Sequence, residues 1–315
     1  MHKYFKLLIH RVFSLFLFSL IAINLNAGQI AITFDDAPLP GSKLMDGKEK
    51  TTAIIKALKQ HKVPSATFFL TMQNIGSKKD VARLKQYDDA GYKLAHHSFS
   101  HLSASKNNFE QYKNDFIKAD KKLFLLGLNN VIKQHRFPFL HHGDTDKKRA
   151  KIKDLLNENG YSLGYVTVDN FDWYINSKAV EAFNNGKQID FDNLKELYID
   201  ALWYSITFYD DLAKNYLKRL PKHVLLLHEN ELAALFLGDL IEHIKSKGWE
   251  IISPEEAYKD PIANINKDLK FNKQGRVAAL AHDKGANKIG LRSKTENISH
   301  LDDLFIKYKV IKNDE

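Results

Sequence analysis

Short apolar runs that end in polar or charged residues recur along the chain, and the clearest lies near the start. Residues 30–34 are apolar or β-branched, and they lead directly into the adjacent carboxylates Asp35 and Asp36. Pro38 and Pro40 prevent the strand from continuing. A short apolar run bounded in this way is typical of a buried parallel strand. We therefore expect a strand whose C-terminal end carries two carboxylates, which repel each other unless a positive group lies beside them.

Helical and strand-like patterns alternate through most of the remaining chain. The pattern predicts strands at residues 66–70, 92–95, 134–137, 161–168, 224–227 and 249–252. It predicts helices at residues 51–61, 81–90, 109–126, 148–159, 194–212 and 231–247, and a helix start at 253–256. Residues 174–193 are expected to form a long connection. Such alternation favours parallel strands, arranged as a (β/α) barrel or a doubly wound sheet.

Polar side chains follow the ends of several of these strands. They are Asp35, Asp36, His97, Asp169 to Asp172, and His228, and Phe139 also follows a strand end. In a barrel of parallel strands these ends converge on one face, which is where active sites lie. The pattern therefore predicts a single site built from residues far apart in the chain.

The first 27 residues have the pattern of a secretory signal peptide. A basic start is followed by the apolar stretch 12–25, and Ala27 marks the expected cleavage site. Leu25 is larger than the residue usually found three positions before a cut, so a retained membrane anchor is the alternative. We expect a secreted or periplasmic protein with no stable membrane span in the mature chain.

The composition limits the chemistry that is open to the chain. Its 315 residues include no cysteine, so disulfides, thiolate ligands and thiol nucleophiles are excluded. Any metal must be held by His, Asp or Glu. The formal net charge of +9 comes from scattered residues, without an arginine-rich stripe interleaved with aromatics. We expect no nucleic acid partner, whereas attraction to an anionic envelope polymer fits the charge.

The strand–helix alternation weakens after residue 259. We expect one domain over residues 28–259, followed by an extension at 260–315 that packs on the barrel. The extension holds one short apolar run at 277–281 and a final helix or strand at 302–311. No internal repeat is visible.

His97 and His101 are spaced so that both imidazoles can converge on one ion. Together with Asp36 they form a set of two histidines and one carboxylate, which leaves metal positions open for water and substrate. His96 could also be a ligand. Such ligands accept zinc, and also cobalt, nickel or manganese.

Five segments resemble, in order, the motifs of the polysaccharide deacetylases, which are the family 4 carbohydrate esterases with a NodB-homology domain. They are Thr33-Phe34-Asp35-Asp36, His97-Ser98-Phe99-Ser100-His101, Arg136-Phe137-Pro138-Phe139, Asp169-Asn170-Phe171-Asp172-Trp173 and Leu226-Leu227-His228. The resemblance covers about residues 29–258. It implies a distorted (β/α)₇ barrel of the NodB-homology type. It also implies hydrolysis of N-acetyl or O-acetyl groups on an acetylated glycan.

The resemblance further implies a role for each matching residue, beginning with the metal centre. Asp36, His97 and His101 would bind a divalent metal, most often Zn²⁺. Asp35 would be the general base that acts on the metal-bound water. Arg136 would hold Asp35 in place.

The other implied roles concern the leaving group and the acetyl pocket. His228 would be the general acid, and Asp172 would orient it. Trp173 and Leu226 would line the pocket for the acetyl methyl group. The backbone N–H of Phe139 would help to hold the oxyanion.

Two other functions stay open at this stage. One is a catalytically inactive glycan-binding protein on the same barrel, and the other is a related amidase acting on a non-sugar amide. Phenylalanines replace the proline and tyrosine of many family members in the third motif. His141 and His142 follow it, and the sequence assigns them no role. Which polysaccharide is the substrate is also open.

Overall fold

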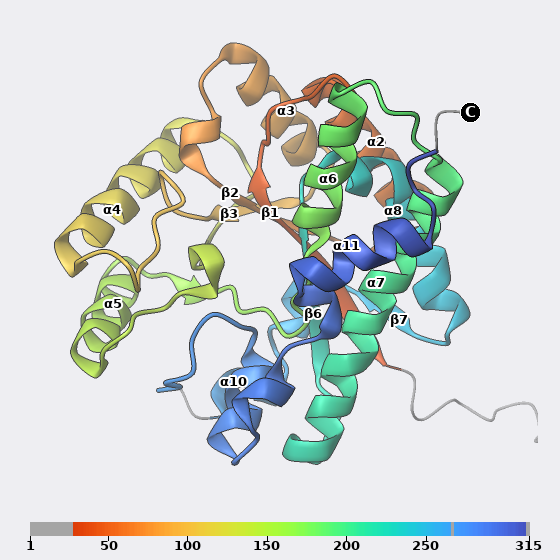
Figure 1. Ribbon diagram of the computed structural model, residues 1–315. Coiled ribbons are helices and arrows are strands. Elements are labelled where there is room, and N and C mark those ends of the chain that lie inside the picture. Colours follow the sequence, from red (N-terminus) through yellow and green to blue (C-terminus); the bar gives the residue numbers. More distant parts are fainter. Residues whose placement is uncertain (1–27, 266–267, 313–315) are drawn as a thin grey trace, which may run out of the picture.

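A curled sheet of parallel strands lies at the centre of the computed structural model, which describes residues 28–265 and 268–312 (Figure 1). The expected signal peptide, residues 1–27, lies outside the described residues. The strands are β1 (Gln29–Ala37), β2 (Thr67–Leu70), β3 (Lys93–His96), β4 (Val131–His135), β5 (Ser162–Leu163), β6 (Lys222–His228) and β7 (Glu250–Ile252). Their order is β5-β4-β3-β2-β1-β6, and β7 pairs with the start of β1. This curled half-barrel confirms the predicted distorted (β/α)₇ barrel.

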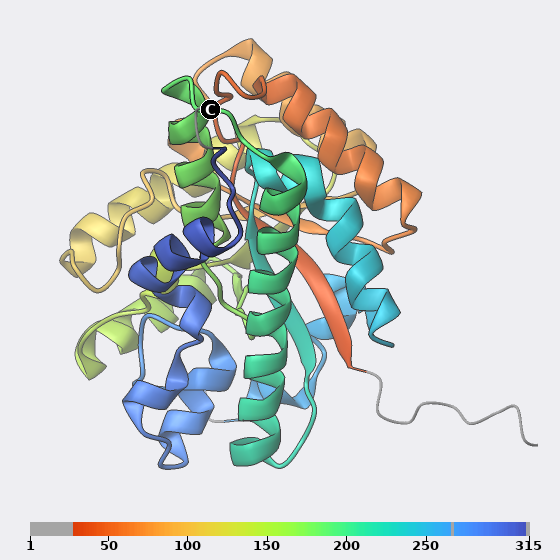
Figure 2. The ribbon, with the colours of Figure 1, turned by 45° about the vertical axis from the view of Figure 1, so that its right-hand side comes forward.

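Helices surround the sheet in both views (Figures 1 and 2). They are α2 (Gly47–Gln60), α3 (Lys78–Asp89), α4 (Phe109–Leu125), α5 (Asp146–Glu158), α6 (Asp172–Asn184), α7 (Phe191–Leu212), α8 (Glu231–Ser246) and α9 (Pro254–Ala257). Of the described helices, none combines the length and the apolar character needed to cross a membrane.

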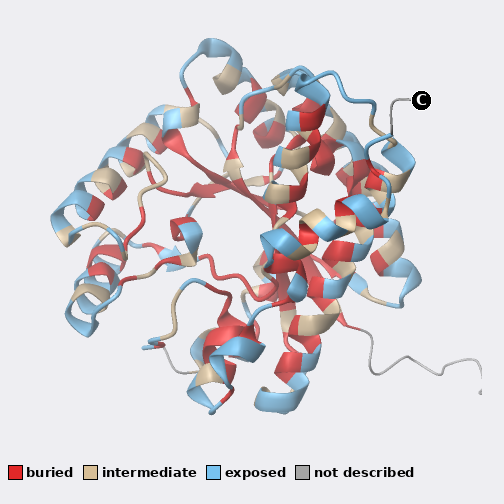
Figure 3. Ribbon diagram, in the orientation of Figure 1, coloured by how far each residue is buried: buried red, intermediate tan, exposed pale blue. Residues whose placement is uncertain are grey.

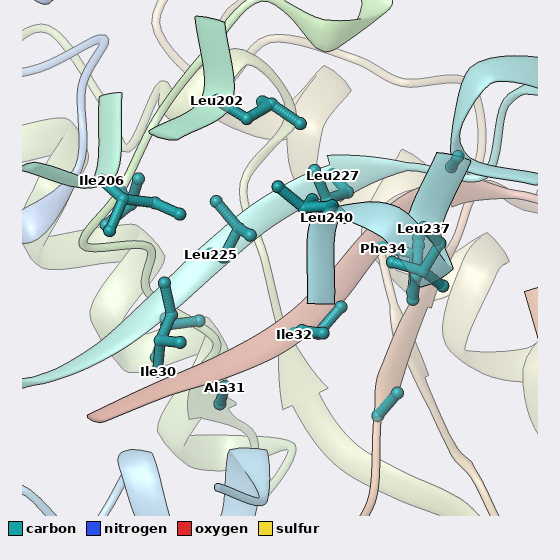
Figure 4. Close-up of a cluster of buried hydrophobic side chains, with 14 of the residues drawn as sticks. Ile30, Ala31, Ile32, Phe34, Leu202, Ile206, Leu225, Leu227, Leu237 and Leu240 are labelled. Atoms are coloured by element: carbon teal, nitrogen blue, oxygen red, sulfur yellow. The ribbon is translucent and has the colours of Figure 1, made fainter. Parts of the chain in front are cut away.

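The main hydrophobic core lies between the β1–β6 pair and the helices α7 and α8 (Figure 4). β1 and β6 pair in parallel from Gln29 opposite Lys222 to Asp35 opposite His228. Ile32 of β1 and Leu225 of β6 are fully buried in this core. Burying each such side chain contributes about 1.5–3 kcal/mol. Most residues of β1 and β6 are accordingly buried, as the red strands at the centre of the sheet show (Figure 3).

The predicted strand at 161–168 is only partly correct. β5 ends at Leu163, and the chain then crosses to the other edge of the sheet, where Val168 makes a single parallel bridge to Leu225. Gly164 lies where the chain leaves β4, and a Cβ there would come within 2.5 Å of the Phe69 ring. The chain therefore passes the Phe69 ring at a distance that only glycine allows, directly after the regular strand ends at Leu163.

The predicted long connection at 174–193 is wrong, because helix α6 occupies most of it. Ile175, Ala179 and Ala182 are buried at helical spacing. That periodicity is the signal that was missed, since the aromatic residues around it obscured the pattern. The strand predicted at 134–137 also begins earlier than expected, because β4 starts at Val131 rather than at Gln134.

The segment after residue 259 consists of short helices that contact the main body of the structure. They are η4 (Pro261–Asn264), α10 (Arg276–Asp283), η5 (Lys288–Leu291), η6 (Lys294–Glu296) and α11 (Ile298–Lys307). α10 and α11 both contact α7, and α11 lies beside it in both views (Figures 1 and 2). The Arg276 N–H also donates to the Val166 carbonyl at 2.6 Å. The division into a domain and an extension stays a prediction.

Candidate active site

The two carboxylates at the end of β1 are held in place by neighbouring strand ends. Asp36 has a left-handed backbone (φ 65°), which turns its side chain out of the strand. Its Oδ1 accepts a hydrogen bond from the Thr71 hydroxyl at 2.7 Å, and its carbonyl accepts one from the Asn74 amide at 2.9 Å. Thr71 directly follows β2. The adjacent strand therefore fixes the carboxylate before any ion binds.

Asp36, His97 and His101 offer ligand atoms that lie within 4.8 Å of one another. Asp36 Oδ1 lies 3.8 Å from His97 Nε2 and 3.5 Å from His101 Nε2. His97 Nδ1 donates to the Arg136 carbonyl at 2.9 Å, so its Nε2 lone pair is directed at the carboxylates. Two imidazole nitrogens and one carboxylate oxygen suit a divalent cation such as zinc. These residues could hold a metal ion.

The protonation states of these groups also suit a cation. Burial lowers the pKa of His97 well below its ordinary value, and the positive charges of His101 and Arg136 add to the effect despite the attraction of Asp36. Burial alone would raise the pKa of Asp36, but His97, His101 and His228 outweigh it and lower this pKa. The geometry therefore combines a neutral imidazole with an ionised carboxylate, which are the forms that bind metal.

Asp35 pairs with Arg136 in the interior. The two are joined by a 2.6 Å hydrogen bond from Arg136 Nη1 to Asp35 Oδ1, and both side chains are almost fully buried. Arg136 also donates to the Gly164 carbonyl at 2.8 Å and to the Tyr258 hydroxyl at 3.0 Å. Its guanidinium lies 3.9 Å from the centre of the Phe69 ring. With Arg136 fixed on every side, Asp35 keeps Oδ2 directed toward His97 Nε2, at 3.6 Å.

His228 pairs with Asp172 across the opposite side of the site. Asp172, fully buried, accepts from His228 Nδ1 at 2.7 Å and from the His228 backbone N–H at 2.8 Å. His228 Nε2 then faces Asp36 Oδ2 at 4.0 Å. Burial lowers the pKa of His228, but Asp172, Asp36 and Asp35 outweigh it and raise the pKa to about 9. A divalent cation at Asp36 would oppose this rise.

Comparison with known proteins shows which family this chain resembles. Residues 22–161 match the sequence profile of the polysaccharide deacetylase family. Over these residues the chain is similar to the polysaccharide deacetylases. A peptidoglycan-N-acetylglucosamine deacetylase of Bacillus cereus is 34% identical over 148 residues, which are 47% of this chain and 47% of that protein. A chitin deacetylase of Arthroderma benhamiae is 25% identical over 240 residues, covering 75% of this chain and 53% of that protein. The chain thus spans about half the length of the curated relatives it matches.

A solved structure is similar to this chain in fold. A CE4 family pseudoenzyme from Bacillus anthracis has a TM-score of 0.51 with this chain at 18% identity, covering 74% of this chain and 66% of that chain. This likeness supports the barrel and its strand order. Because that neighbour is described as a pseudoenzyme, the fold alone does not establish activity.

Three further residues were predicted to contact substrate. Phe139 is exposed in the short helix η2 (Pro138–Leu140), and its ring lies 4.4 Å from that of His101. Trp173 is the second residue of α6, beside Asp172, and it is 41% exposed. Leu226 is buried on β6, two residues before His228 and hence on the same side of the strand. Their positions border the site, and their roles stay predictions.

The histidines without a role in the sequence are all engaged by the protein. His96 Nδ1 lies 2.7 Å from His135 Nδ1 in the interior. His141 Nδ1 lies 2.7 Å from the Ser103 hydroxyl, and His142 Nε2 donates to the Phe271 carbonyl at 2.8 Å. None of the three belongs to the metal-ligating group among the described residues.

Sequence reasoning missed three residues that position the candidate active site. Thr71 donates a hydrogen bond to Asp36, and Tyr258 accepts one from Arg136. Of the two, only Thr71 could have been found from the sequence, since it follows a strand end. Glu229 is fully buried directly after His228. It pairs with Arg83 at 2.8 Å and accepts from the Leu39 N–H at 2.8 Å, which holds the turn after Asp36. A buried glutamate beside the last motif cannot be distinguished from a surface residue by pattern alone.

Proposed function

We propose that this chain is a metal-dependent deacetylase that hydrolyses N-acetyl or O-acetyl groups on an extracellular or envelope polysaccharide. The observation that carries the proposal is the convergence of three pieces. A candidate cation site at Asp36 lies beside the Asp35–Arg136 pair and opposite the His228–Asp172 pair. A glycan-binding protein without activity would need none of these three in working order.

The chemistry requires a stronger nucleophile than free water at neutral pH. A divalent ion held by Asp36, His97 and His101 would supply Lewis-acid activation of water and of the acetyl carbonyl. Asp35 would accept the proton that the attacking water loses, through the Oδ2 that Arg136 leaves free. Arg136 keeps this carboxylate ionised and fixes its orientation, although it also makes the carboxylate a weaker base.

The leaving amine or alcohol must gain a proton as the acetyl group departs. His228 is suited to donate it, because Asp172 accepts from Nδ1 and so leaves the Nε2–H directed into the site. The carboxylate also stabilises the imidazolium before transfer. Trp173 and Leu226 would line the pocket around the acetyl methyl group, and the backbone N–H of Phe139 would help to hold the oxyanion.

An acetate-release screen tests this proposal. Protein loaded with zinc, cobalt, nickel or manganese is incubated with chitin oligomers, peptidoglycan, acetylated xylan and poly-N-acetylglucosamine. We expect acetate from at least one of these glycans, and loss of most of that release on chelation. Asp35→Asn is the matched control, since it keeps the shape of the side chain that accepts the Arg136 hydrogen bond.

The outcomes separate the three functions that the sequence leaves open. Metal-dependent release from a glycan that Asp35→Asn abolishes supports the deacetylase. Binding of glycans with no release under any metal would support the inactive binding protein instead. Release from simple N-acetyl amides but from none of the glycans would support the non-sugar amidase.

A further inference from the structure

A groove of about 600 Å³ lies in the C-terminal segment, apart from the candidate metal ligands. Four basic side chains line it, and no carboxylate does; they are Lys270, Lys273, Lys288 and Arg292. We call it the basic groove. A concave surface lined by one sign of charge concentrates the local field and attracts ions of the opposite sign.

Nearby carboxylates neutralise only part of this charge. Lys270 lies 3.6 Å from Asp146, and Arg292 lies 3.7 Å from Glu296. Among the described residues no salt bridge reaches Lys273 or Lys288, and both are exposed. The groove therefore presents two lysines whose charge the rest of the described chain does not balance.

The walls of the basic groove also suit a sugar chain. The Phe271 ring stacks on His282 with centroids 4.7 Å apart and planes 25° apart. Ile289 is 89% exposed at the edge. Apolar surface combined with a few placed polar groups is typical of ligand sites. An anion-binding surface for a small inorganic ion alone would have no use for the exposed Ile289.

Hydrogen bonds join the basic groove to the candidate active site. The Lys273 N–H donates to the Leu140 carbonyl at 3.3 Å. The side chain of Asn272 accepts from the His142 N–H at 2.9 Å and donates to the Gly143 carbonyl at 3.1 Å. Residues 140–143 directly follow Phe139, whose ring contacts His101. A chain of sugars leaving the metal site past Phe139 would therefore reach Lys273.

We propose that the basic groove binds an acidic group, carboxylate or phosphate, carried by the same glycan strand whose acetyl group lies at the metal site. The substrate class is then an acidic acetylated glycan rather than a neutral one. This inference rests on the proposed function for the identity of the strand. Lys273 and Lys288 supply the charge, and the loop at 140–143 sets the distance from the reacting sugar.

Matched oligosaccharides test the proposal by binding rather than by turnover. Fluorescently labelled chitohexaose is compared with the same oligosaccharide carrying 6-O-carboxymethyl groups, and with one carrying 6-O-phosphoryl groups. Fluorescence polarisation is measured in the Asp35→Asn background, so that the probes are not consumed. Two changes are then added together, Lys273→Gln and Lys288→Gln. Lys56→Gln with Lys113→Gln, which alters two exposed lysines elsewhere, is the matched control.

We expect the groove variant to weaken binding of at least one acidic probe by roughly five- to tenfold at low salt, and to leave the neutral probe unchanged. The carboxymethyl and phosphoryl arms identify which acid the groove prefers. Lys288→Gln alone should give a smaller loss in the same direction. This single change leaves Lys273, whose N–H donates to the Leu140 carbonyl, unaltered.

Three outcomes would overturn the inference. They are equal binding of acidic and neutral probes, equal loss in the Lys56/Lys113 control, and tighter lysine-dependent binding of a DNA oligonucleotide of matched charge. The proposed function fails separately. If no glycan releases acetate while the acidic probes bind through the two lysines, the groove stands and the deacetylase does not. If acetate is released and the lysines have no effect on binding, the reverse holds.

Discussion

His96 and His97 are adjacent in the sequence and both buried, yet they serve two different regions of the molecule. His97 directs Nε2 at Asp35 and Asp36. His96 directs its ring away from the site, where it meets His135 and the Phe116 carbonyl. Successive side chains of a strand point to opposite faces, so the end of β3 sends one imidazole to each region.

The second region is a closed hydrogen-bond network. His96 Nδ1 accepts from the Ser98 N–H at 3.1 Å, so the hydrogen between the two rings belongs to His135 Nδ1. His135 Nε2 then accepts from the Tyr112 hydroxyl at 2.6 Å. Every ring nitrogen has a protein partner, and both imidazoles are neutral. The two regions differ in what their ring nitrogens face. In the candidate active site a histidine nitrogen faces carboxylates, whereas in the closed network every ring nitrogen has a hydrogen-bond partner in the protein.

The largest expected difference between the two regions is in catalysis. Asp35→Asn and His228→Ala should each lower kcat by ~10²–10⁴, because removing a positioned base or acid costs that much. KM should change less, since both groups act mainly in the transition state. Tyr112→Phe, in the closed network, should keep kcat near that of the unaltered protein. Acetate release on the best substrate from the screen measures all three, and near-normal release by His228→Ala would show that another group donates the proton.

Metal content separates the adjacent histidines directly. We expect about one divalent ion per chain in the unaltered protein, because one set of ligands converges. Replacing His97 and His101 with alanine should remove it, whereas His96→Phe should retain it. Elemental analysis after dialysis against the same metal buffer makes the measurement. Equal metal in the His97/His101 variant and the unaltered protein would place the ion elsewhere.

Stability should be affected in the opposite sense. Tyr112→Phe leaves His135 Nε2 without its donor, and an unpaired buried polar group costs about 1–3 kcal/mol. The free energy of unfolding from urea titration should fall by that amount. Tyr216→Phe, at a surface position, serves as the matched control and should cost less than about 0.5 kcal/mol. A loss no larger than that of the control would mean that the hydroxyl contributes nothing to the network.

The last expected difference is a pH dependence of stability that differs in sign between the regions. Burial lowers the pKa of His96 to about 4, against the attraction of Asp120 and Asp115. The contribution of His96 to the free energy of unfolding is therefore complete above its unfolded-state pKa near 6.5. It is lost as the pH falls from 6.5 toward 4. The pKa of His228 is raised to about 9, so its contribution to the free energy of unfolding is complete below pH 6.5. It is lost as the pH rises toward 9.

The combined contribution of His96 and His228 to the stability of the metal-free protein should therefore be largest near pH 6.5. Urea unfolding at several pH values, with chelator present, measures the profile. His96→Phe should flatten only the acid side, and His228→Gln should flatten only the alkaline side. A profile that both variants leave unchanged would mean that neither histidine titrates as its surroundings indicate.

Much of the fold follows from local pattern, and the site follows from it only in part. Apolar runs ending in Asp35, His97 and His228 marked strand ends, and parallel pairing brings such ends together. The choice between His96 and His97 needed the phase of β3, which a four-residue strand does not reveal. The partners Tyr258 and Asn272 could not be predicted, because they depend on how the last segment returns to the barrel. Helix α6 was missed for a simpler reason, since the aromatic residues around its buried alanines obscured the helical periodicity.

The hydrogen bond from the Arg276 N–H to the Val166 carbonyl has a consequence for modularity. Val166 lies in the segment that crosses between the two edges of the sheet, two residues before the bridge to Leu225. The C-terminal segment thus supplies backbone partners to the part of the barrel that its own strands leave unpaired. Expressing the barrel without this segment would leave the unpaired backbone around Val166 open to other chains. In a fusion or a chimera, the two pieces must be moved as one unit.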